Sequence, residues 1–210
     1  MSSLSRLMLV SDRRRFGGGR MPSTIAVALT TGPAVVQIRE KDLSDDAVIH
    51  MTDHIRREAG PENIMILNGR PAVALRAGAG LHLPAARTAL LETRPPCSLL
   101  GCSVHDPGEI ESALAFSPDY LVAGTVFKTL SKPGIPGCGL AGLRRLVAAA
   151  EGIPVYAIGG MQPEHVEAVL GAGAYGVAVS GGILGAGDPA QAALRYLNAL
   201  GAGHERQNSG

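Results

Sequence analysis

Residues 154–182 read PVYAIGGMQPEHVEAVLGAGAYGVAVSGG, in which two hydrophobic strands each end in a glycine doublet, Gly159-Gly160 and Gly181-Gly182. Without a Cβ, glycine lets backbone N–H groups approach an anion closely, and Gly182-Ile183-Leu184 is placed to open a short helix whose positive end attracts negative charge. Two such turns on successive strands predict a phosphate cradle at the last two strands of a (β/α)8 barrel. Glycines that only turn the chain explain either doublet alone, but explain both together less well.

Over the rest of the chain, short apolar runs alternate with alanine-rich amphipathic stretches, which is the pattern of repeated βα units. The sequence predicts strands near residues 7–11, 34–39, 63–67, 79–83, 97–102, 119–124, 154–158 and 174–179. It predicts helices near residues 22–30, 44–59, 70–77, 84–92, 107–116, 139–150, 162–171 and 188–199. Eight of each predict an α/β fold, a single-domain (β/α)8 TIM barrel over residues 1–201, followed by a disordered tail at 202–210. The alternative is an open doubly wound sheet, but no dinucleotide fingerprint follows the first strand.

The composition narrows the class of protein. Apolar residues make up 46% of the 210 residues and aromatic residues only 3%, so the core is built from Ala, Val, Leu and Ile, as in α/β proteins. With 19 basic and 18 acidic residues, the net charge of +1 gives no case for binding nucleic acid or a membrane surface. The three cysteines lack metal-ligand spacing, and no apolar run suits a signal peptide or a membrane span. We therefore expect a soluble cytoplasmic protein, with a homo-oligomer left open.

In a barrel of this kind the chemistry lies at the carboxyl ends of the strands. The two-residue period of the second strand places Gln37, Arg39 and Lys41 on one side, where they would offer an amide and two cations to an anionic ligand. Solvated charges at a surface strand end are the alternative. Asn68, at the end of the third strand, would either bind a ligand or cap the following helix.

The fifth strand ends in Ser103-Val104-His105, and histidine is the side chain best suited to moving a proton near neutral pH. The irregular stretch from 125 to 139 carries Thr129, Ser131 and Lys132, which would form an anion clamp on a closing loop. His82 is interpreted as a residue of the core or the mouth. Arg13-Arg14-Arg15 is interpreted as a solvated basic turn, although the first loop opens onto the same face.

Together these residues resemble the thiamine phosphate synthase and TenI superfamily of thiamine biosynthesis, over nearly the whole chain. The matching motifs are Val36 to Lys41, Ser103 to His105, Gly124 to Lys132 and Ile158 to Met161. The resemblance implies a (β/α)8 barrel that binds a small-molecule thiazole phosphate. The implied substrate-binding residues are Gln37, Arg39, Lys41, Asn68, Ser103, Thr129, Ser131 and Lys132. The implied phosphate-binding residues are Gly159, Gly160, Val179, Ser180, Gly181 and Gly182.

The two branches of the superfamily differ at the metal site. In the synthase branch, the resemblance places one aspartate after the asparagine of the third strand and another in a Gly-Gln-Glu-Asp-like run after the fourth, and these two hold magnesium. The corresponding positions here are Gly69 and Pro84-Ala85-Ala86-Arg87. Because magnesium needs oxygen ligands, we expect no metal and no cofactor, with magnesium only in the case of a synthase. Asn68-Gly69-Arg70 and Leu83-Pro84 resemble the TenI branch instead.

Resemblance to the TenI branch implies a thiazole tautomerase, an isomerase that aromatises a carboxythiazole phosphate by proton transfer. His105 is then the expected general acid/base, supported by Ser103, with Arg39 or Lys41 facing the carboxylate. One alternative is a magnesium-dependent thiamine phosphate synthase, a transferase that joins a pyrimidine pyrophosphate to the thiazole phosphate. The segment from Gln37 to Lys41, which is suited to pyrophosphate, favours that alternative. The other is a non-catalytic sensor or regulator of a phosphorylated ligand.

Overall fold

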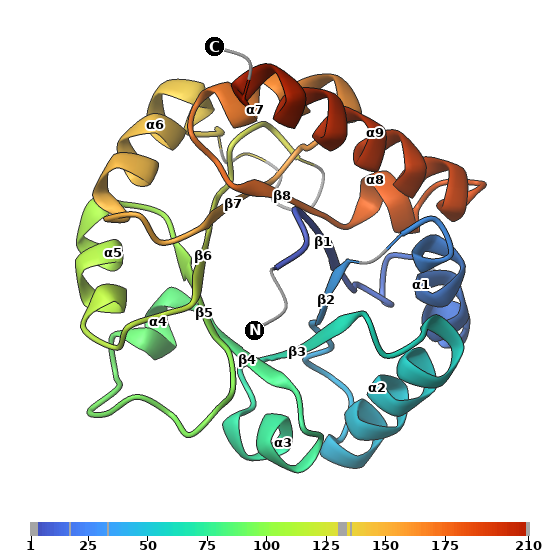
Figure 1. The fold of residues 1–210 in the computed structure, drawn as a ribbon. Helices are drawn as coiled ribbons and strands as arrows, with labels where there is room; N and C mark the ends of the chain where they lie inside the picture. The colour runs from blue at the N-terminus through green and yellow to red at the C-terminus, as the bar shows by residue number, and fades with distance from the viewer. Residues whose placement is uncertain (1–3, 17, 33, 130–133, 135, 209–210) are drawn as a thin grey trace.

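The computed structural model describes residues 4–16, 18–32, 34–129, 134 and 136–208. Eight parallel strands form a closed barrel in which each strand pairs with the next one in the chain and the eighth with the first (Figure 1). The strands are β1 (Leu7–Val10), β2 (Val35–Ile38), β3 (Ile64–Asn68), β4 (Gly80–Leu83), β5 (Leu100–Val104), β6 (Tyr120–Gly124), β7 (Val155–Ile158) and β8 (Gly176–Val179). The predicted (β/α)8 barrel is therefore confirmed.

The helices surround the barrel on its outside (Figure 1). They are α1 (Met21–Leu29), α2 (Asp45–Ala59), α3 (Pro71–Arg76), α4 (Ala85–Thr88), α5 (Pro107–Leu114), α6 (Gly139–Ala149), α7 (Val166–Gly171), α8 (Gly181–Leu184) and α9 (Pro189–Asn208). Two 3-10 turns, η1 (Gly18–Arg20) and η2 (Pro163–His165), precede α1 and α7.

One departure from the predicted boundaries lies between β4 and β5. The helix predicted at 84–92 is a single turn, and β5 begins at Leu100 rather than at residue 97. Pro95 and Pro96 have no N–H to donate to a strand partner. Strand pairing begins at Leu100, which lies opposite Leu81, and the Leu100 N–H is accepted by the Asp119 carboxylate at 2.7 Å.

Both faces of the strands are buried, which divides the core in two. Outward-facing residues such as Leu81 and Val177 pack against the helices. Inside the barrel, a second cluster contains Met8, Val10, Val35, Ile66, Tyr120, Val122, Tyr156 and Ala178. This packing closes the interior below the carboxyl ends of the strands, where the polar residues lie.

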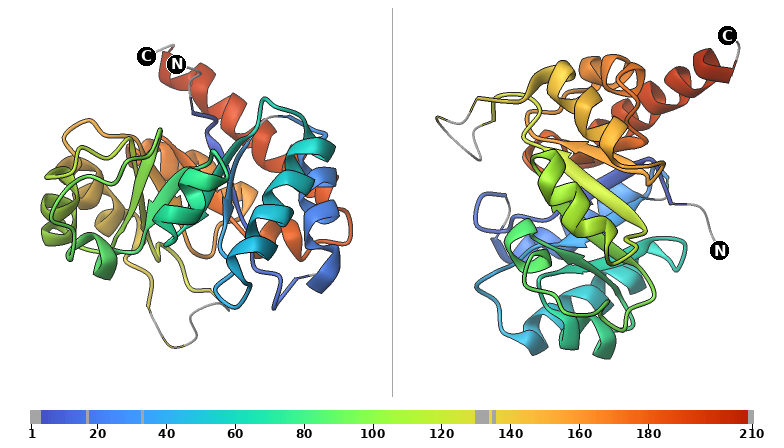
Figure 2. Two further views of the ribbon diagram at one scale, coloured as in Figure 1. Left: turned by 90° about the horizontal axis from the view of Figure 1, so that it is seen from below. Right: turned by 90° about the vertical axis from the view of Figure 1, so that its left-hand side faces the viewer.

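The carboxyl-terminal helix is longer than predicted. Helix α9 runs Pro189–Asn208 and extends away from the barrel, through most of the segment that the sequence assigns to a tail (Figure 2). Residues 209–210 lie outside the described part of the chain. Among the described residues, no helix combines the length and the apolar character that crossing a membrane requires.

Candidate active site

Four polar side chains come from the inward-facing positions of β2 to β5. Gln37 is only 4% exposed, and its amide donates to the Met8 sulfur at 3.9 Å. The Asn68 side-chain amide donates to the side-chain oxygen Oε1 of Gln37 at 3.5 Å. The Asn68 side chain does not cap α3, whose N-cap position is Arg70 without a side-chain cap hydrogen bond. Of the two roles open to Asn68, the structure therefore favours the one inside the barrel.

His82 lies at the centre of this polar group. Its ring nitrogens pair with the Tyr120 hydroxyl at 3.1 Å and the Ser103 hydroxyl at 2.8 Å. Burial, together with the positive charge of Arg39, lowers the pKa of His82 to about 3, so the ring is neutral near pH 7. Burial also raises the pKa of Tyr120 well above its ordinary value. The alternation of β4 carried the signal for this position, because it turns Leu81 and Leu83 outward and His82 inward.

His105 is held by the start of α5. Its Nδ1 lies 2.8 Å from a carboxylate oxygen of Glu109, and the same oxygen accepts the His105 backbone N–H at 2.6 Å. Asp106 caps the helix by accepting the Glu109 N–H at 2.9 Å. The Ser103 hydroxyl pairs with His82 inside the barrel, and its support of His105 stays a prediction.

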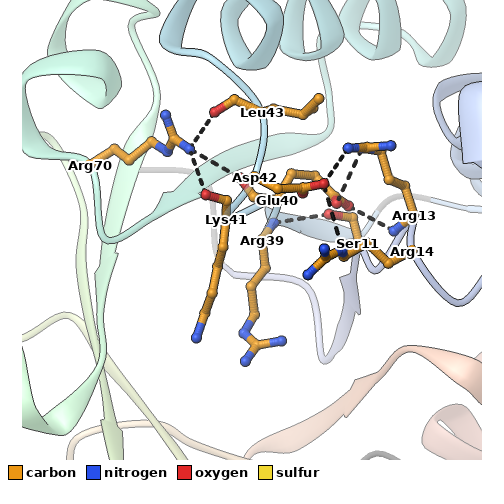
Figure 3. Close-up of polar contacts among 9 residues, drawn as sticks. All are labelled: Ser11, Arg13, Arg14, Arg39, Glu40, Lys41, Asp42, Leu43 and Arg70. Atoms are coloured by element: carbon orange, nitrogen blue, oxygen red, sulfur yellow. Dashed lines mark hydrogen bonds and ion pairs between the residues drawn. The ribbon is translucent and has the colours of Figure 1, made fainter.

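The end of β2 separates its charges onto two sides (Figure 3). The side chains of Arg39 and Lys41 are exposed and extend next to each other in one direction. Glu40, which is 4% exposed, and Asp42 turn the other way, toward Arg13. Among the described residues, no carboxylate forms an ion pair with Arg39 or Lys41. Both cations are therefore available to bind an anionic ligand.

The basic segment after β1 binds the two acids that flank these cations. Arg13 donates its backbone N–H to Glu40 at 3.0 Å, and its guanidinium lies 2.5 Å from the Asp42 carboxylate. Arg14 approaches Asp42 at 3.6 Å. The interpretation as a solvated basic turn is therefore wrong for Arg13. The alternation of acids with cations from Arg39 to Asp42 was the available signal for this pairing.

The glycine turns after β7 and β8 lie against neighbouring loops. Gly160 has φ +63°, and a Cβ there would meet the Lys128 carbonyl oxygen at 2.4 Å. A Cβ on Gly181 would meet the Phe16 ring at 2.8 Å. Close packing against backbone therefore explains the glycine at 160, whereas at 181 the obstacle is the end of the Phe16 side chain. The phosphate cradle stays a prediction. The Val179 side chain belongs to the outer core, so only its backbone faces the turn.

Ser180, between β8 and α8, carries the strongest sign of a ligand at this end. Its hydroxyl oxygen is buried and has no hydrogen-bond partner within the described residues. A buried polar atom without a partner is costly unless a ligand or a water satisfies it. The first amides of α8, at Gly181 and Gly182, also lack intrahelical partners, as at every helix start.

The loop after β6 lies beside the end of β7. Val126 and Phe127 donate backbone N–H groups to the carbonyls of Ile158 and Gly159 at 2.9 and 3.0 Å. Thr129 follows this paired segment, whereas Ser131 and Lys132 lie outside the described residues.

The positions that the resemblance assigns to magnesium do not offer its ligands. Gly69 has φ +69° and donates its N–H to the His82 carbonyl at 2.8 Å, and Pro84 follows β4 where the carboxylate-bearing run would begin. Within the part of the chain that the structure describes, no three or more His, Cys, Asp or Glu side chains come together as a metal site. The side chains present therefore do not fit magnesium.

Fold and site together define the class: a (β/α)8 barrel with a polar, cation-bearing site at the carboxyl ends of its strands. The family model described as thiamine monophosphate synthase matches residues 7–183. The chain belongs to this family.

Relatives and solved structures agree with that assignment. The chain is 36% identical to the thiamine-phosphate synthase of Salinispora tropica, covering 95% of this chain and 99% of the relative. It is 38% identical to that of Methanoculleus marisnigri, covering 93% and 95%. The thiamine phosphate pyrophosphorylase structure from Pyrococcus furiosus superposes with a TM-score of 0.80 at 27% identity, covering 94% and 96%. A 3-hexulose-6-phosphate synthase structure, at 18% identity and TM-score 0.68 with 93% and 100% covered, shares the fold.

These relatives correct the predicted activity. The residues at the ends of the third and fourth strands favour a thiazole tautomerase of the TenI branch, whereas relatives at 34–38% identity over most of the chain are named thiamine-phosphate synthase. The tautomerase prediction is therefore wrong, and with it the isomerase class. The tautomerase prediction gave the two missing magnesium carboxylates, at Gly69 and after Leu83, more weight than the remainder of the chain.

Proposed function

We propose that this protein is a transferase that joins a pyrimidine pyrophosphate to a thiazole phosphate and releases pyrophosphate. In the reaction, the thiazole nitrogen forms a bond to the methylene carbon of the pyrimidine. The bond from that carbon to the pyrophosphate oxygen breaks, and its electron pair leaves with the pyrophosphate. The products are thiamine phosphate and pyrophosphate. The identity of 34–38% to named synthases over more than nine-tenths of the chain supports this assignment.

The observation that carries the proposal is the cation pair at the end of β2. Pyrophosphate gains negative charge as it leaves, and a guanidinium beside an ammonium provides a forked donor and a point charge for its oxygens. Arg39 and Lys41 extend together, while Arg13 engages the neighbouring acids Glu40 and Asp42 (Figure 3). Gln37 and Asn68, one layer deeper, are suited to the polar edge of a pyrimidine.

The thiazole phosphate is assigned to another part of the mouth, at the end of β8, which β1 separates from β2. The unpartnered hydroxyl of Ser180 and the first amides of α8, at Gly181 and Gly182, are suited to phosphate oxygens. Gly160 and Thr129 come from the adjoining turn and loop. Binding the two anionic groups at separate strand ends of one mouth lets the thiazole nitrogen and the pyrimidine methylene carbon meet between them.

Magnesium is not assigned a role, because Gly69 and Pro84 supply no oxygen ligands where the resemblance implies aspartates. We assign the neutralisation of the negative charge on the leaving pyrophosphate to Arg39 and Lys41 instead. Titration of magnesium into the substrate-free protein, followed by calorimetry, is expected to give no binding heat. Stoichiometric binding at micromolar metal would contradict this assignment.

The test of the function is a turnover assay on the purified protein with both substrates. We expect thiamine phosphate and pyrophosphate to appear in a one-to-one ratio, and neither to appear when one substrate is omitted. Release of pyrophosphate without the thiazole phosphate would identify a hydrolase, and the absence of both products would contradict the proposal.

A further inference from the structure

The segment that carries the cation pair is fixed by a residue from another strand end. Arg70, directly after β3, lies beside the loop that joins β2 to α2 (Figure 3). Its Nη2 donates to the backbone carbonyl oxygens of Leu43 at 2.7 Å, Glu40 at 3.1 Å and Lys41 at 3.5 Å. Its Nη1 binds the Asp45 carboxylate in the first turn of α2. One guanidinium thus holds both ends of the loop.

The other side of the same segment is held from β1. The Ser11 hydroxyl accepts the backbone N–H of Arg39 at 2.9 Å, and Arg13 binds Glu40 and Asp42. These contacts leave the backbone of residues 39–43 little freedom. The side chains of Arg39 and Lys41 are the parts of the segment that extend away from both clamps (Figure 3).

We infer that Arg70 is a positioning residue for the pyrophosphate site: it sets the backbone from which Arg39 and Lys41 reach the leaving group. The inference rests on the proposed transferase function. Arg70 acts through carbonyl oxygens on the opposite side of the loop. Its contribution is therefore geometric, and another positively charged side chain at position 70 does not replace it.

Arginine is required because one side chain has to reach several acceptors at once. The guanidinium is planar and presents five N–H donors in a fixed fork, whereas a lysine ammonium is a single point on a flexible stem. Arg70→Lys keeps the charge and gives up most of the carbonyl contacts. The variant therefore separates loop geometry from long-range attraction of the anion.

Arg56 provides a matched control. It too holds backbone carbonyls with both guanidinium nitrogens, Ala77 at 2.6 Å and Gly78 at 2.8 Å, but it lies near the carboxyl end of α2 rather than at the mouth. Arg56→Lys removes a comparable set of hydrogen bonds far from the cation pair. Equal losses of thermal stability in the two variants would then go with unequal losses of ligand affinity.

The experiment measures binding of inorganic pyrophosphate by calorimetry and the KM of each substrate, in the full chain. Arg70→Lys is expected to weaken pyrophosphate binding, and to raise the KM for the pyrimidine pyrophosphate, by roughly tenfold. The KM for the thiazole phosphate should change less than about twofold, as should all values for Arg56→Lys. Asp45→Asn, which removes only the carboxylate partner of Arg70, is expected to give the same change at about two- to threefold.

Pyrophosphate affinity that is unchanged in both Arg70→Lys and Asp45→Asn, in a protein that otherwise binds it, would overturn the inference and leave the transferase standing. Equal effects of Arg70→Lys and Arg56→Lys would overturn it too, because they would assign Arg70 to overall stability. A failure of the unaltered protein to bind pyrophosphate at all would contradict the proposed function, and the inference with it.

Discussion

The two sides of the barrel mouth are built in different ways. On the β2–β3 side, charged side chains are arranged by other charged side chains: Arg13 and Arg70 hold the segment from which Arg39 and Lys41 extend (Figure 3). On the β7–β8 side, the turns are glycines packed against neighbouring backbone and side chains, and the available donors are amides and the Ser180 hydroxyl. The β2–β3 side tolerates changes of backbone poorly because contacts from residues distant in the sequence determine its geometry. The β7–β8 side tolerates added atoms poorly because its glycines already lie against neighbouring loops.

The largest expected effect removes the charges from the first side. Arg39→Gln combined with Lys41→Gln should lower kcat/KM by roughly 10²–10⁴-fold, since each charge-assisted contact contributes about 1.5–3 kcal/mol. Arg57→Gln combined with Arg76→Gln removes two exposed cations from the outer helices and is expected to change kcat/KM less than about threefold. Similar losses in both double variants would mean that net charge, rather than this pair, attracts the substrate.

The second prediction adds an atom to the other side. Gly160→Ala places a Cβ 2.4 Å from the Lys128 carbonyl oxygen at φ +63°, so strain and overlap both destabilise the fold. Gly78→Ala is the matched control, because it has φ +54° and nothing within 4 Å of the added Cβ. We expect Gly160→Ala to cost about 1–3 kcal/mol more than Gly78→Ala in urea denaturation. Equal losses of unfolding free energy in the two variants would show that the close approach of the two loops does not require glycine at position 160.

The third prediction concerns His82, whose pKa is lowered by burial and by the positive charge of Arg39. The pKa of His82 is about 3 in the folded protein and near its ordinary 6.5 when unfolded, so between these values only the unfolded state takes up the proton. Stability from this group is therefore complete above pH 6.5 and falls as the pH drops, by up to roughly 1.4 kcal/mol per pH unit.

The measurement is urea denaturation of the unaltered protein and of His82→Asn at several pH values from 4 to 8. The slope of stability against pH should be smaller in His82→Asn than in the unaltered protein. If His82→Asn keeps the original slope, the ring is not the group that titrates.

The fourth and smallest effect tests the phosphate side without disturbing its packing. Ser180→Ala should weaken binding of the thiazole phosphate by roughly tenfold without lowering the free energy of unfolding, because the hydroxyl has no partner to lose among the described residues. Ser112→Ala, which removes an exposed hydroxyl bonded to the Gly108 carbonyl, should leave the affinity unchanged. Unaltered affinity in Ser180→Ala would place the phosphate elsewhere.

The sequence predicted the barrel and the projection of Arg39 and Lys41 because both depend on local periodicity. It did not predict that Arg13 engages Glu40, which is 27 positions away, or that Arg70 holds the Lys41 carbonyl. Contacts of this kind depend on which strand ends the closed barrel brings together. His82 was placed only at the core or the mouth, because its partners Ser103 and Tyr120 come from later strands.

The activity was misjudged for a related reason. Gly69 and the segment from Pro84 to Arg87 are a small part of the chain, and their chemistry excludes magnesium ligands at those positions. They do not by themselves decide between a transferase and an isomerase, because both would use the same cations and the same glycine turns. Identity of 36% over 95% of the chain weighs many more positions.

The division of the mouth into a pyrophosphate side and a phosphate side is tested most directly by a crystal structure of the protein grown with inorganic pyrophosphate and the thiazole phosphate. We expect pyrophosphate within hydrogen-bond distance of the Arg39 guanidinium and the Lys41 ammonium. We expect the thiazole phosphate group on the Ser180 hydroxyl and the first amides of α8. Both anions on the glycine turns, with Arg39 and Lys41 extended into solvent, would contradict this division.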